Sequence, residues 1–281
     1  MRFLTRMLGL RHKRLQSSTI VLPPVHGYQI VYNEATRSMV DPDFEPLVNE
    51  RPAKPDWFEY WPIRNFFSDR RVDDSAFYGF LSPKFNLKTG LRGSEVLAFI
   101  ESVPDVDVVL FSPFPEHGAG FLNVFEQQQV FDSGFFRVCQ NFLSSLGDDT
   151  DVRTVIHHSQ SVVFSNFFFA KPRFWREWLD VCERLVAASE RGDMRDGLCE
   201  GFVYAQANGE SKAVQRKVFL MERIASYLLG RRTQPYNVAH YPVAKMRQLS
   251  HAVSIGGVLD EMDRLKCTLT QGGDAALLVR Y

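Results

Sequence analysis

The stretch Ser161–Ala188, "SVVFSNFFFAKPRFWREWLDVCERLVAA", contains both kinds of pattern on which the fold prediction depends. Its first ten residues are almost continuously apolar or aromatic, which predicts a buried strand. Pro172 suits the first turn of a helix. After this proline, Trp178, Cys182 and Leu185 recur at helical spacing and predict an amphipathic helix. A strand followed directly by a helix indicates an α/β protein.

The same alternation of strands and helices continues on both sides of this stretch. Short apolar runs bounded by polar residues or proline predict further strands at 28–32, 77–82 and 107–112. Helices are predicted to begin near Pro62, at Ser94 as the N-cap and after Gly134, and to cover 218–229 and 259–269. We therefore predict an α/β layered domain with a mixed, mostly parallel sheet flanked by helices.

Composition limits the class of protein. The chain has 281 residues, no net charge and a pI near 7.1, so nothing global indicates a nucleic-acid partner. Its four cysteines are far apart and form no CxxC pair, which favours reduced thiols in a cytoplasmic protein. No apolar run approaches the roughly 20 residues that span a bilayer.

Three segments are predicted along the chain. Residues 1–24 mix basic and apolar side chains, and residues 25–250 hold the main α/β domain. Residues 251–281 are expected to form a C-terminal helical extension. The first segment is either a disordered leader or an amphipathic helix that contacts an anionic membrane surface weakly through residues 1–14.

The stretch "DWFEYWPIRNFF" (56–67) places six aromatic rings among charged and amide side chains. Large aromatic residues dominate protein cores, so core packing is the simpler interpretation for each ring. The alternative is a pocket wall on which a flat ligand stacks. We expect the rings to be mostly core, and Glu59, Arg64 and Asn65 to face a cleft.

Several common functional motifs are absent from the sequence, namely GxGxxG, GxxxxGK[ST], HExxH and GxSxG. Asp105 and Asp107 form one of three carboxylate pairs with DxD-like spacing, which can hold Mg²⁺ or Mn²⁺ against a diphosphate. Such pairs normally lie at the ligand end of a strand, whereas this pair begins one. Solvated carboxylates at the strand start are therefore the preferred interpretation.

Five segments together resemble glycosyltransferase-like proteins of bacterial capsule and O-antigen clusters. They keep the order seen in those proteins and span roughly residues 28–245. The segments are "EYWPIRNFF" (59–67), "FYGFLSPKF" (77–85), "SPFPEHGAGFLNVFEQ" (112–127), "FSNFFFAKPRFWREW" (164–178) and "FLMERIASYLL" (219–229).

The resemblance implies a single GT-A-like domain that binds a nucleotide-sugar donor and transfers the sugar to a glycan or lipid-linked acceptor. Related proteins carry a basic, histidine-containing tetrad where this chain has Ser82-Pro83-Lys84-Phe85. Because of this departure the need for a cofactor stays open between Mn²⁺ or Mg²⁺ and no metal.

Sugar transfer from such a donor sets three chemical requirements. Arg64 and Lys84 could offset the charge of the leaving diphosphate, and Ser82 belongs to the same donor-binding turn. The neutral groups of Ser165 and Asn166 suit sugar hydroxyls, or they cap the following helix. The candidate general bases, each flanked by apolar residues, are Glu126, Glu200 and Glu222.

Two functions follow from these observations. The first is a glycosyltransferase of surface-polysaccharide biosynthesis, cytoplasmic and peripheral at the inner membrane face. The second is a non-catalytic protein that retains the fold and binds a sugar or nucleotide. The resemblance favours the first function, whereas the poorly placed DxD pair favours the second.

Overall fold

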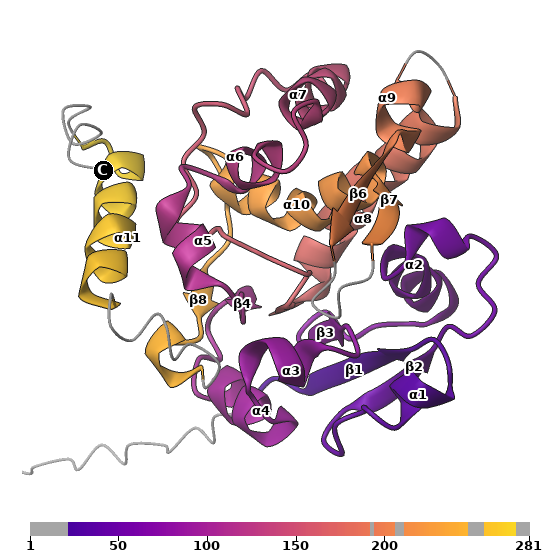
Figure 1. Ribbon diagram of the computed structural model, residues 1–281. Helices are drawn as coiled ribbons and strands as arrows, with labels where there is room; N and C mark the ends of the chain where they lie inside the picture. The colour runs from indigo at the N-terminus through magenta and orange to yellow at the C-terminus, as the bar shows by residue number, and fades with distance from the viewer. Residues whose placement is uncertain (1–21, 192–193, 206–210, 247–255, 274–281) are drawn as a thin grey trace, which may run out of the picture.

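The computed structural model describes residues 22–191, 194–205, 211–246 and 256–273, which form a six-stranded sheet with helices on both faces (Figure 1). The strands follow the order β2-β1-β3-β5-β4-β8, and β5 runs antiparallel to both of its neighbours. All other neighbouring pairs in this sheet are parallel. The predicted α/β domain with a mixed, mostly parallel sheet is therefore confirmed.

The strands of this sheet are short. They are β1 (Val25–Val31), β2 (Glu45–Val48), β3 (Phe77–Leu81), β4 (Val108–Leu110), β5 (Phe168–Ala170) and β8 (Val238–His240). A separate antiparallel hairpin consists of β6 (Gly201–Ala205) and β7 (Ser211–Gln215). Figure 1 shows this hairpin beside the helices rather than in the main sheet.

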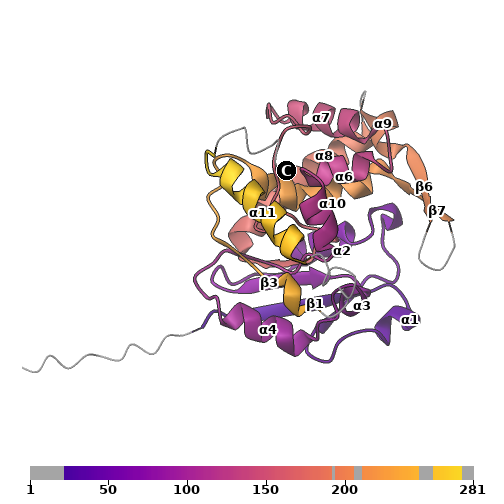
Figure 2. The same ribbon diagram turned by 60° about the vertical axis from the view of Figure 1, so that its left-hand side comes forward.

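Helices cover the two faces of the sheet as separate layers (Figure 2). On one face lie α2 (Tyr60–Asp69), α7 (Phe135–Ser145), α8 (Pro172–Glu190) and α10 (Arg216–Gly230), which contribute to one core. On the other face α3 (Phe85–Thr89) and α4 (Gly93–Glu101) contribute to a second core. The remaining helical segments are α1 (Glu34–Arg37), α5 (Pro115–Gly120), α6 (Val124–Gln129), α9 (Arg195–Cys199), α11 (Gly256–Thr270) and the short 3-10 turns η1 (Pro55–Trp57) and η2 (Val243–Lys245).

Strand β3 shows why the apolar runs are nearly continuous. Successive side chains point to opposite faces, so Tyr78 and Phe80 join the first core while Phe77 and Leu81 join the second. Both faces are covered, and neither tolerates polar residues. Between them, Gly79 allows close packing, because a Cβ atom there would lie 2.5 Å from the ring of Phe169 in β5.

The prediction of one long strand at 161–170 is wrong, since only Phe168–Ala170 is a strand. Ser165 and Asn166 have φ angles of 58° and 53°, in the left-handed region that non-glycine residues rarely adopt. The amide of Phe167 donates to the carbonyl of Phe164 at 3.2 Å, which closes a turn. An apolar pattern cannot reveal this reversal, because the flanking residues are buried in either case.

Two predicted helix starts are also shifted. Ser94 is not the N-cap of α4. Arg92 occupies that position, and its backbone amide donates to the Glu95 carboxylate at 3.0 Å. Helix α2 begins at Tyr60, so Pro62 lies in its first turn, where a missing amide proton has no cost. The aromatic stretch before and within α2 is mostly core, as expected, with Trp57, Tyr60 and Phe66 buried.

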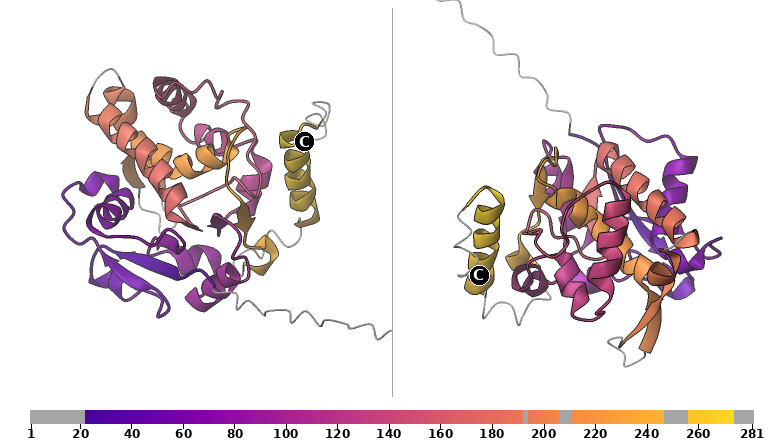
Figure 3. Two further views of the ribbon diagram at one scale, coloured as in Figure 1. Left: turned by 180° about the vertical axis from the view of Figure 1, so that it is seen from behind. Right: turned by 90° about the horizontal axis from the view of Figure 1, so that it is seen from above.

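Helix α11 covers the predicted C-terminal helix and lies on the opposite side of the molecule from α2 (Figure 3). It packs beside α5, where Lys266 donates to the backbone carbonyls of Gly118 and Phe121. Within the described ranges, no helix has the length and apolar character needed to cross a bilayer. The predicted membrane contact of residues 1–14 lies outside the described residues.

Candidate functional site

Three chain segments that are distant in sequence meet at one edge of the sheet. Parallel strands β1 and β3 end at this edge, and the antiparallel β5 begins there. Tyr32 directly follows β1, Lys88 lies on α3 after β3, and the turn at Ser165–Asn166 precedes β5. Ligands of α/β proteins commonly bind outside the carboxyl ends of the parallel strands. The side chains gathered here are therefore the candidate site.

The turn at Ser165–Asn166 is held in its left-handed conformation by polar contacts. Lys88 Nζ lies 2.8 Å from the Ser165 hydroxyl, and Asn166 Nδ2 lies 3.5 Å from the Met221 sulfur on α10. Non-glycine residues in this conformation carry a conformational cost, and such strain is often retained where a site requires it. The turn thus directs the fully buried Asn166 side chain toward α2 and α10.

Lys88 is positioned because α3 is fixed at its start. The Asn86 side chain donates to the Asp41 carboxylate at 2.8 Å and to the Leu91 carbonyl at 2.9 Å. The buried Gln29 of β1 donates to Asn86 Oδ1 at 3.3 Å. These bonds orient the short helix, so the Lys88 ammonium group points toward the turn rather than into solvent.

Glu59 is the most perturbed carboxyl group of the cluster. It precedes α2 at the N-cap position, and its Oε2 atom is shielded from solvent although part of the residue reaches the surface. Burial, and then the nearby charge of Glu222, raise the pKa of Glu59 to about 8. The charge of Lys88 and a hydrogen bond from Asn166 act in the opposite direction. Glu59 is thus mostly protonated at neutral pH.

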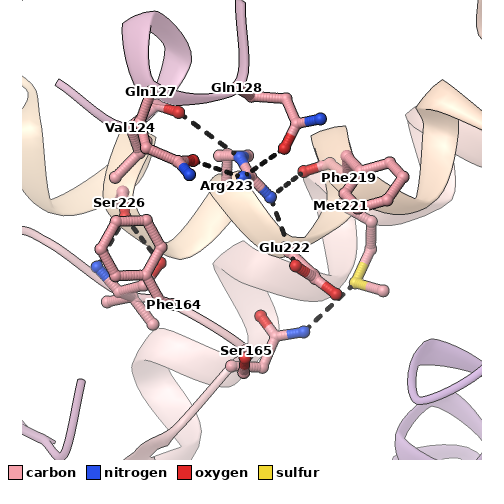
Figure 4. A network of polar contacts seen from close by, with 12 residues as sticks. Val124, Gln127, Gln128, Phe164, Ser165, Phe219, Met221, Glu222, Arg223 and Ser226 are labelled. Carbon is pink, nitrogen blue, oxygen red and sulfur yellow. Dashed lines mark hydrogen bonds and ion pairs between the residues drawn. The ribbon is translucent and has the colours of Figure 1, made fainter. Parts of the chain in front are cut away.

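Glu222 is the second carboxylate and lies on α10 between Arg223 and the turn at Ser165 (Figure 4). Arg223 Nη1 lies 3.2 Å from Glu222 Oε2, and the Arg223 guanidinium is buried. The same guanidinium donates to the side-chain oxygens of Gln127 and Gln128 at 3.0 and 2.8 Å. Glu222 is therefore held by a fixed cation, and 28% of its side chain stays exposed.

Tyr32 completes the cluster. Burial, and then the charges of Glu59 and Glu222, raise the pKa of its phenol above the ordinary range. The phenol therefore remains a neutral hydrogen-bond donor and acceptor. Two carboxyl groups, one phenol and one ammonium group therefore lie near one another at the sheet edge.

Two buried acceptor atoms of the cluster have no hydrogen-bond partner among the described residues, namely Glu59 Oε2 and Asn166 Oδ1. Buried polar atoms without partners are rare, because each loses its hydration without compensation. Asn166 Oδ1 accepts hydrogen bonds, and the Glu59 carboxyl group, which is mostly protonated at neutral pH, both donates and accepts them. A ligand with several hydroxyl or N–H donors would satisfy them.

The other predicted donor-binding residues are not brought into this cluster. Arg64 donates to Glu183 of α8 at 2.5 Å and stacks over Trp61, so its cationic group faces the outer side of α2. Lys84 is exposed, and Asn65 is half-buried on α2. Ser82 is buried after β3, where its carbonyl accepts from Gln29 at 3.3 Å.

Two of the predicted bases have structural partners elsewhere. Glu126 Oε2 accepts from the amide of Leu122 at 2.5 Å, near the start of α6. Glu200 pairs with Arg216, and its side chain is 59% exposed. Of the three candidates, the cluster contains only Glu222.

Asp105 and Asp107 lie at the opposite edge of the sheet from the cluster. Asp107 Oδ2 accepts from the amide of Asn237 at 3.0 Å, at the start of β4. In the described part of the chain, no group of three or more histidine, cysteine, aspartate or glutamate residues is arranged to hold a metal ion. Glu59 and Glu222 supply two carboxylates, but the raised pKa of Glu59 and the nearby ammonium group of Lys88 fit a divalent cation poorly.

Of the predicted residues, the structure therefore brings together Glu59, Ser165, Asn166 and Glu222. Sequence reasoning missed Tyr32 and Lys88. Lys88 lies one helical turn after Lys84 on the same short helix, so it was an equally available cation. Nothing in the pattern around Tyr32 distinguishes it from an ordinary residue at the end of a strand.

Comparisons with protein-family models, with curated proteins and with solved structures find no match to this chain. The function of the cluster must therefore be inferred from its own side chains. Their arrangement combines the carboxyl group of Glu222, the protonated carboxyl group of Glu59 and the ammonium group of Lys88.

Proposed function

We propose that this chain is a glycosyltransferase, which moves a sugar from a nucleotide-sugar donor to a hydroxyl of a glycan or lipid-linked acceptor in bacterial surface-polysaccharide biosynthesis. The observation that carries the proposal is the pair of buried oxygen atoms, Glu59 Oε2 and Asn166 Oδ1, that lack hydrogen-bond partners among the described residues. A sugar ring presents several hydroxyl donors in a small volume. It therefore matches these oxygen atoms better than an apolar or anionic ligand does.

The charges of the cluster suit the transfer step. The acceptor oxygen forms a bond to the anomeric carbon while the bond from that carbon to the diphosphate breaks, and the nucleoside diphosphate leaves. Glu222, held by Arg223, takes the proton of the acceptor hydroxyl as general base. The Lys88 ammonium group offsets negative charge that develops on the leaving diphosphate.

Glu59 has a different role because its pKa is raised to about 8. At neutral pH the protonated carboxyl group donates one hydrogen bond and still accepts another. It therefore orients the sugar and does not compete with Glu222 for the acceptor proton. Two carboxyl groups in different environments can divide such roles.

The cellular setting is part of the same proposal. The expected place of action is the cytoplasm, peripheral at the inner membrane face, with no nucleic-acid partner. The net charge of zero supports only the last of these points, since a nucleic-acid partner usually requires a basic protein surface. The requirement for Mn²⁺ or Mg²⁺ is left to experiment.

The proposal is tested with UDP-, GDP-, CMP- and dTDP-linked sugars, each with and without Mn²⁺. A donor at 100 times its Kd stabilises the fold by about 2.7 kcal/mol, which is measurable as a rise in melting temperature. With the donor so identified, release of nucleoside phosphate is compared between the wild type and Glu222→Gln. We expect the variant to lose about 100-fold or more in rate while it still binds the donor.

Glu200→Gln is the matched control, because Glu200 belongs to the ion pair with Arg216 and not to the cluster. Its rate should equal that of the wild type. A Glu222→Gln variant as active as the wild type would remove Glu222 from the proposed mechanism. No stabilisation by any donor would contradict sugar transfer as a whole.

A second candidate function is binding without catalysis. The ion pair of Glu222 with Arg223 favours it, because structural carboxylates are usually paired in this way. In that case a donor would stabilise the protein, but nucleoside phosphate would not be released. Glu222→Gln would then change binding or stability only.

A further inference from the structure

A cavity of about 480 Å³ opens at the carboxyl ends of β4 and β8. Its base includes Leu110 and Ser112 from the end of β4 and His240 from β8. Helix α5 forms one wall, and the first turns of α11 form another. This volume lies in the range of about 300–1,000 Å³ that is typical of small-molecule sites.

Helix α11 is fixed beside this cavity by its second half. Asp263 Oδ1 accepts from the amide of Ser159 at 2.7 Å, and Lys266 Nζ donates to the carbonyl of Gly118 at 2.6 Å. Leu265 is buried in the same contact. Leu259, about two turns earlier, lines the cavity. The space between α11 and α5 is therefore set by specific contacts of α11 with the rest of the domain.

The walls of the cavity are mostly apolar, with Phe114, Val162, Met246 and Leu259 among them. Two carboxylates, Asp260 and Asp263, supply the charged groups, and the described lining residues include no lysine or arginine. Apolar walls favour the burial of apolar surface. The ammonium group of Lys266 lies against Gly118 and near Asp263, so the charge preference depends mainly on Asp260. This carboxylate disfavours an anionic group and tolerates an uncharged or cationic one.

The cavity is separate from the acidic cluster, which consists of Tyr32, Glu59, Lys88, Ser165, Asn166 and Glu222. The amide of Phe164 donates to the Ser112 hydroxyl at 2.9 Å, and Phe164 directly precedes the turn at Ser165–Asn166. Val162 lines the cavity, whereas Ser165 contacts Lys88 of the cluster. The segment 162–166 thus contributes to both features, and each has its own set of side chains.

We propose that this cavity binds the apolar body of an amphiphile whose polar end is uncharged or cationic, in the manner of a long-chain alcohol or amine. The apolar body lies between α5 and α11, and the polar end lies near Asp260. The inference does not depend on sugar transfer. It concerns side chains outside the acidic cluster.

The ligand preference is measured by displacement of Nile red, an uncharged apolar dye, from the full chain. The competitors are 1-decanol, decylamine and decanoate, which share one chain length and differ in the charge of the polar end, each below its micelle concentration. We expect decanol and decylamine to displace the dye at concentrations about tenfold lower than decanoate. Equal displacement by decanoate, or stronger displacement by uridine or guanosine, would overturn the proposal.

Two neighbouring positions of α11 give a matched pair of variants. Leu259→Trp fills the cavity, and we expect it to weaken dye and decanol binding about tenfold or more. Val258→Trp adds the same ring at a position that is 60% exposed, and it should bind as the wild type does. Unchanged binding by a folded Leu259→Trp variant would place the ligand elsewhere.

Further variants keep the test decisive. If Leu259→Trp does not fold, Val243→Trp fills the cavity from its other side, and the same loss is expected. Asp260→Asn should reduce the ratio between the concentrations of decanoate and decanol that displace the dye. An unchanged ratio would contradict the charge argument. Glu222→Gln should bind decanol normally. Weaker decanol binding by this variant would contradict the independence of the two sites.

Discussion

Two clusters of charge in this molecule differ in how completely their groups are paired. In the first, Arg216 donates to both oxygens of the buried Asp132, at 2.6 and 2.7 Å, and also pairs with Glu200. In the second, burial and the nearby charge of Glu222 favour the protonated form of Glu59, and Glu59 Oε2 has no partner among the described residues. The first cluster fixes α7, α10 and their connections. The second retains unused hydrogen-bonding capacity, as expected of a site that receives a ligand.

The largest effect is expected from Asp132→Ala, which removes one side of the paired cluster. Arg216 would keep a guanidinium that is 9% exposed with only the Glu200 partner. Breaking a buried pair on one side typically costs about 3–5 kcal/mol. We expect the free energy of unfolding in urea to fall by about this amount.

The matched control is Glu200→Ala, because the Glu200 side chain is 59% exposed. An exposed partner contributes about 0–1 kcal/mol. Equal losses of unfolding free energy in both variants would show that burial does not determine how much each carboxylate contributes to stability.

The second largest effect concerns the acidic cluster and depends on pH. The pKa of Glu59 rises from an ordinary value of 4.5 to about 8 on folding. The folded state therefore binds more protons than the unfolded state in this window, and the stability supplied by the protonated form is lost as the pH rises. Glu59→Gln removes this loss. We expect the free energy of unfolding of Glu59→Gln to increase relative to that of the wild type by on the order of 3 kcal/mol as the pH rises from 5 to 9.

The measurement is urea unfolding of both proteins at pH 5, 7 and 9. The difference between them should grow with pH and level off above pH 8. Parallel stability profiles would show that Glu59 titrates as an ordinary surface carboxylate, and the contrast between the two clusters would then fail.

A smaller effect is expected from Lys88→Met. Loss of the ammonium group removes a contact to the leaving diphosphate, so donor affinity should fall about tenfold. The same change removes a charge that lowers the pKa of Glu59, so the pH dependence of stability should move to higher pH. Lys84→Met, at an exposed position of the same segment, should alter neither quantity. A wild-type pH profile in Lys88→Met would separate Lys88 from the cluster.

The smallest effect is expected from Arg64→Ala. Its ion pair with Glu183 joins side chains that are 36% and 45% exposed, and such pairs contribute about 0–1 kcal/mol. Donor binding should not change, because Arg64 faces the outer side of α2. Weaker donor binding in this variant would indicate that Arg64 contacts the donor, and it would contradict the placement of the ligand at the acidic cluster.

Much of the fold could be predicted because strands and helices leave local patterns. The apolar run at 107–112 and the helix after Pro172 are both found, since buried strands and amphipathic helices have distinct periods. The strand predicted at 161–170 was wrong because buried turns and buried strands have similar apolar compositions. Only the φ angles of Ser165 and Asn166 separate the two.

The candidate site was less predictable because its members share no local pattern. Glu59, Ser165, Asn166 and Glu222 were each singled out by neighbouring residues, but their meeting depends on the strand order. Arg64 and Lys84 were reasonable cations by position, yet neither joins the cluster. Lys84 is the N-cap residue of α3 and is exposed, whereas Lys88 lies within the helix and contacts Ser165. The residue at which the helix begins therefore decides which cation faces the cluster.

The sequence by itself determined the class of fold, the aromatic core and the supply of carboxylates and cations near the strand ends. These follow from side-chain periodicity and composition, which are local properties. The tertiary structure decided which carboxylates are paired and which are not. Solvent exclusion and charge separation depend on distances between segments far apart in the chain, so Glu59 acquires its raised pKa only when α2, α10 and the turn before β5 enclose it.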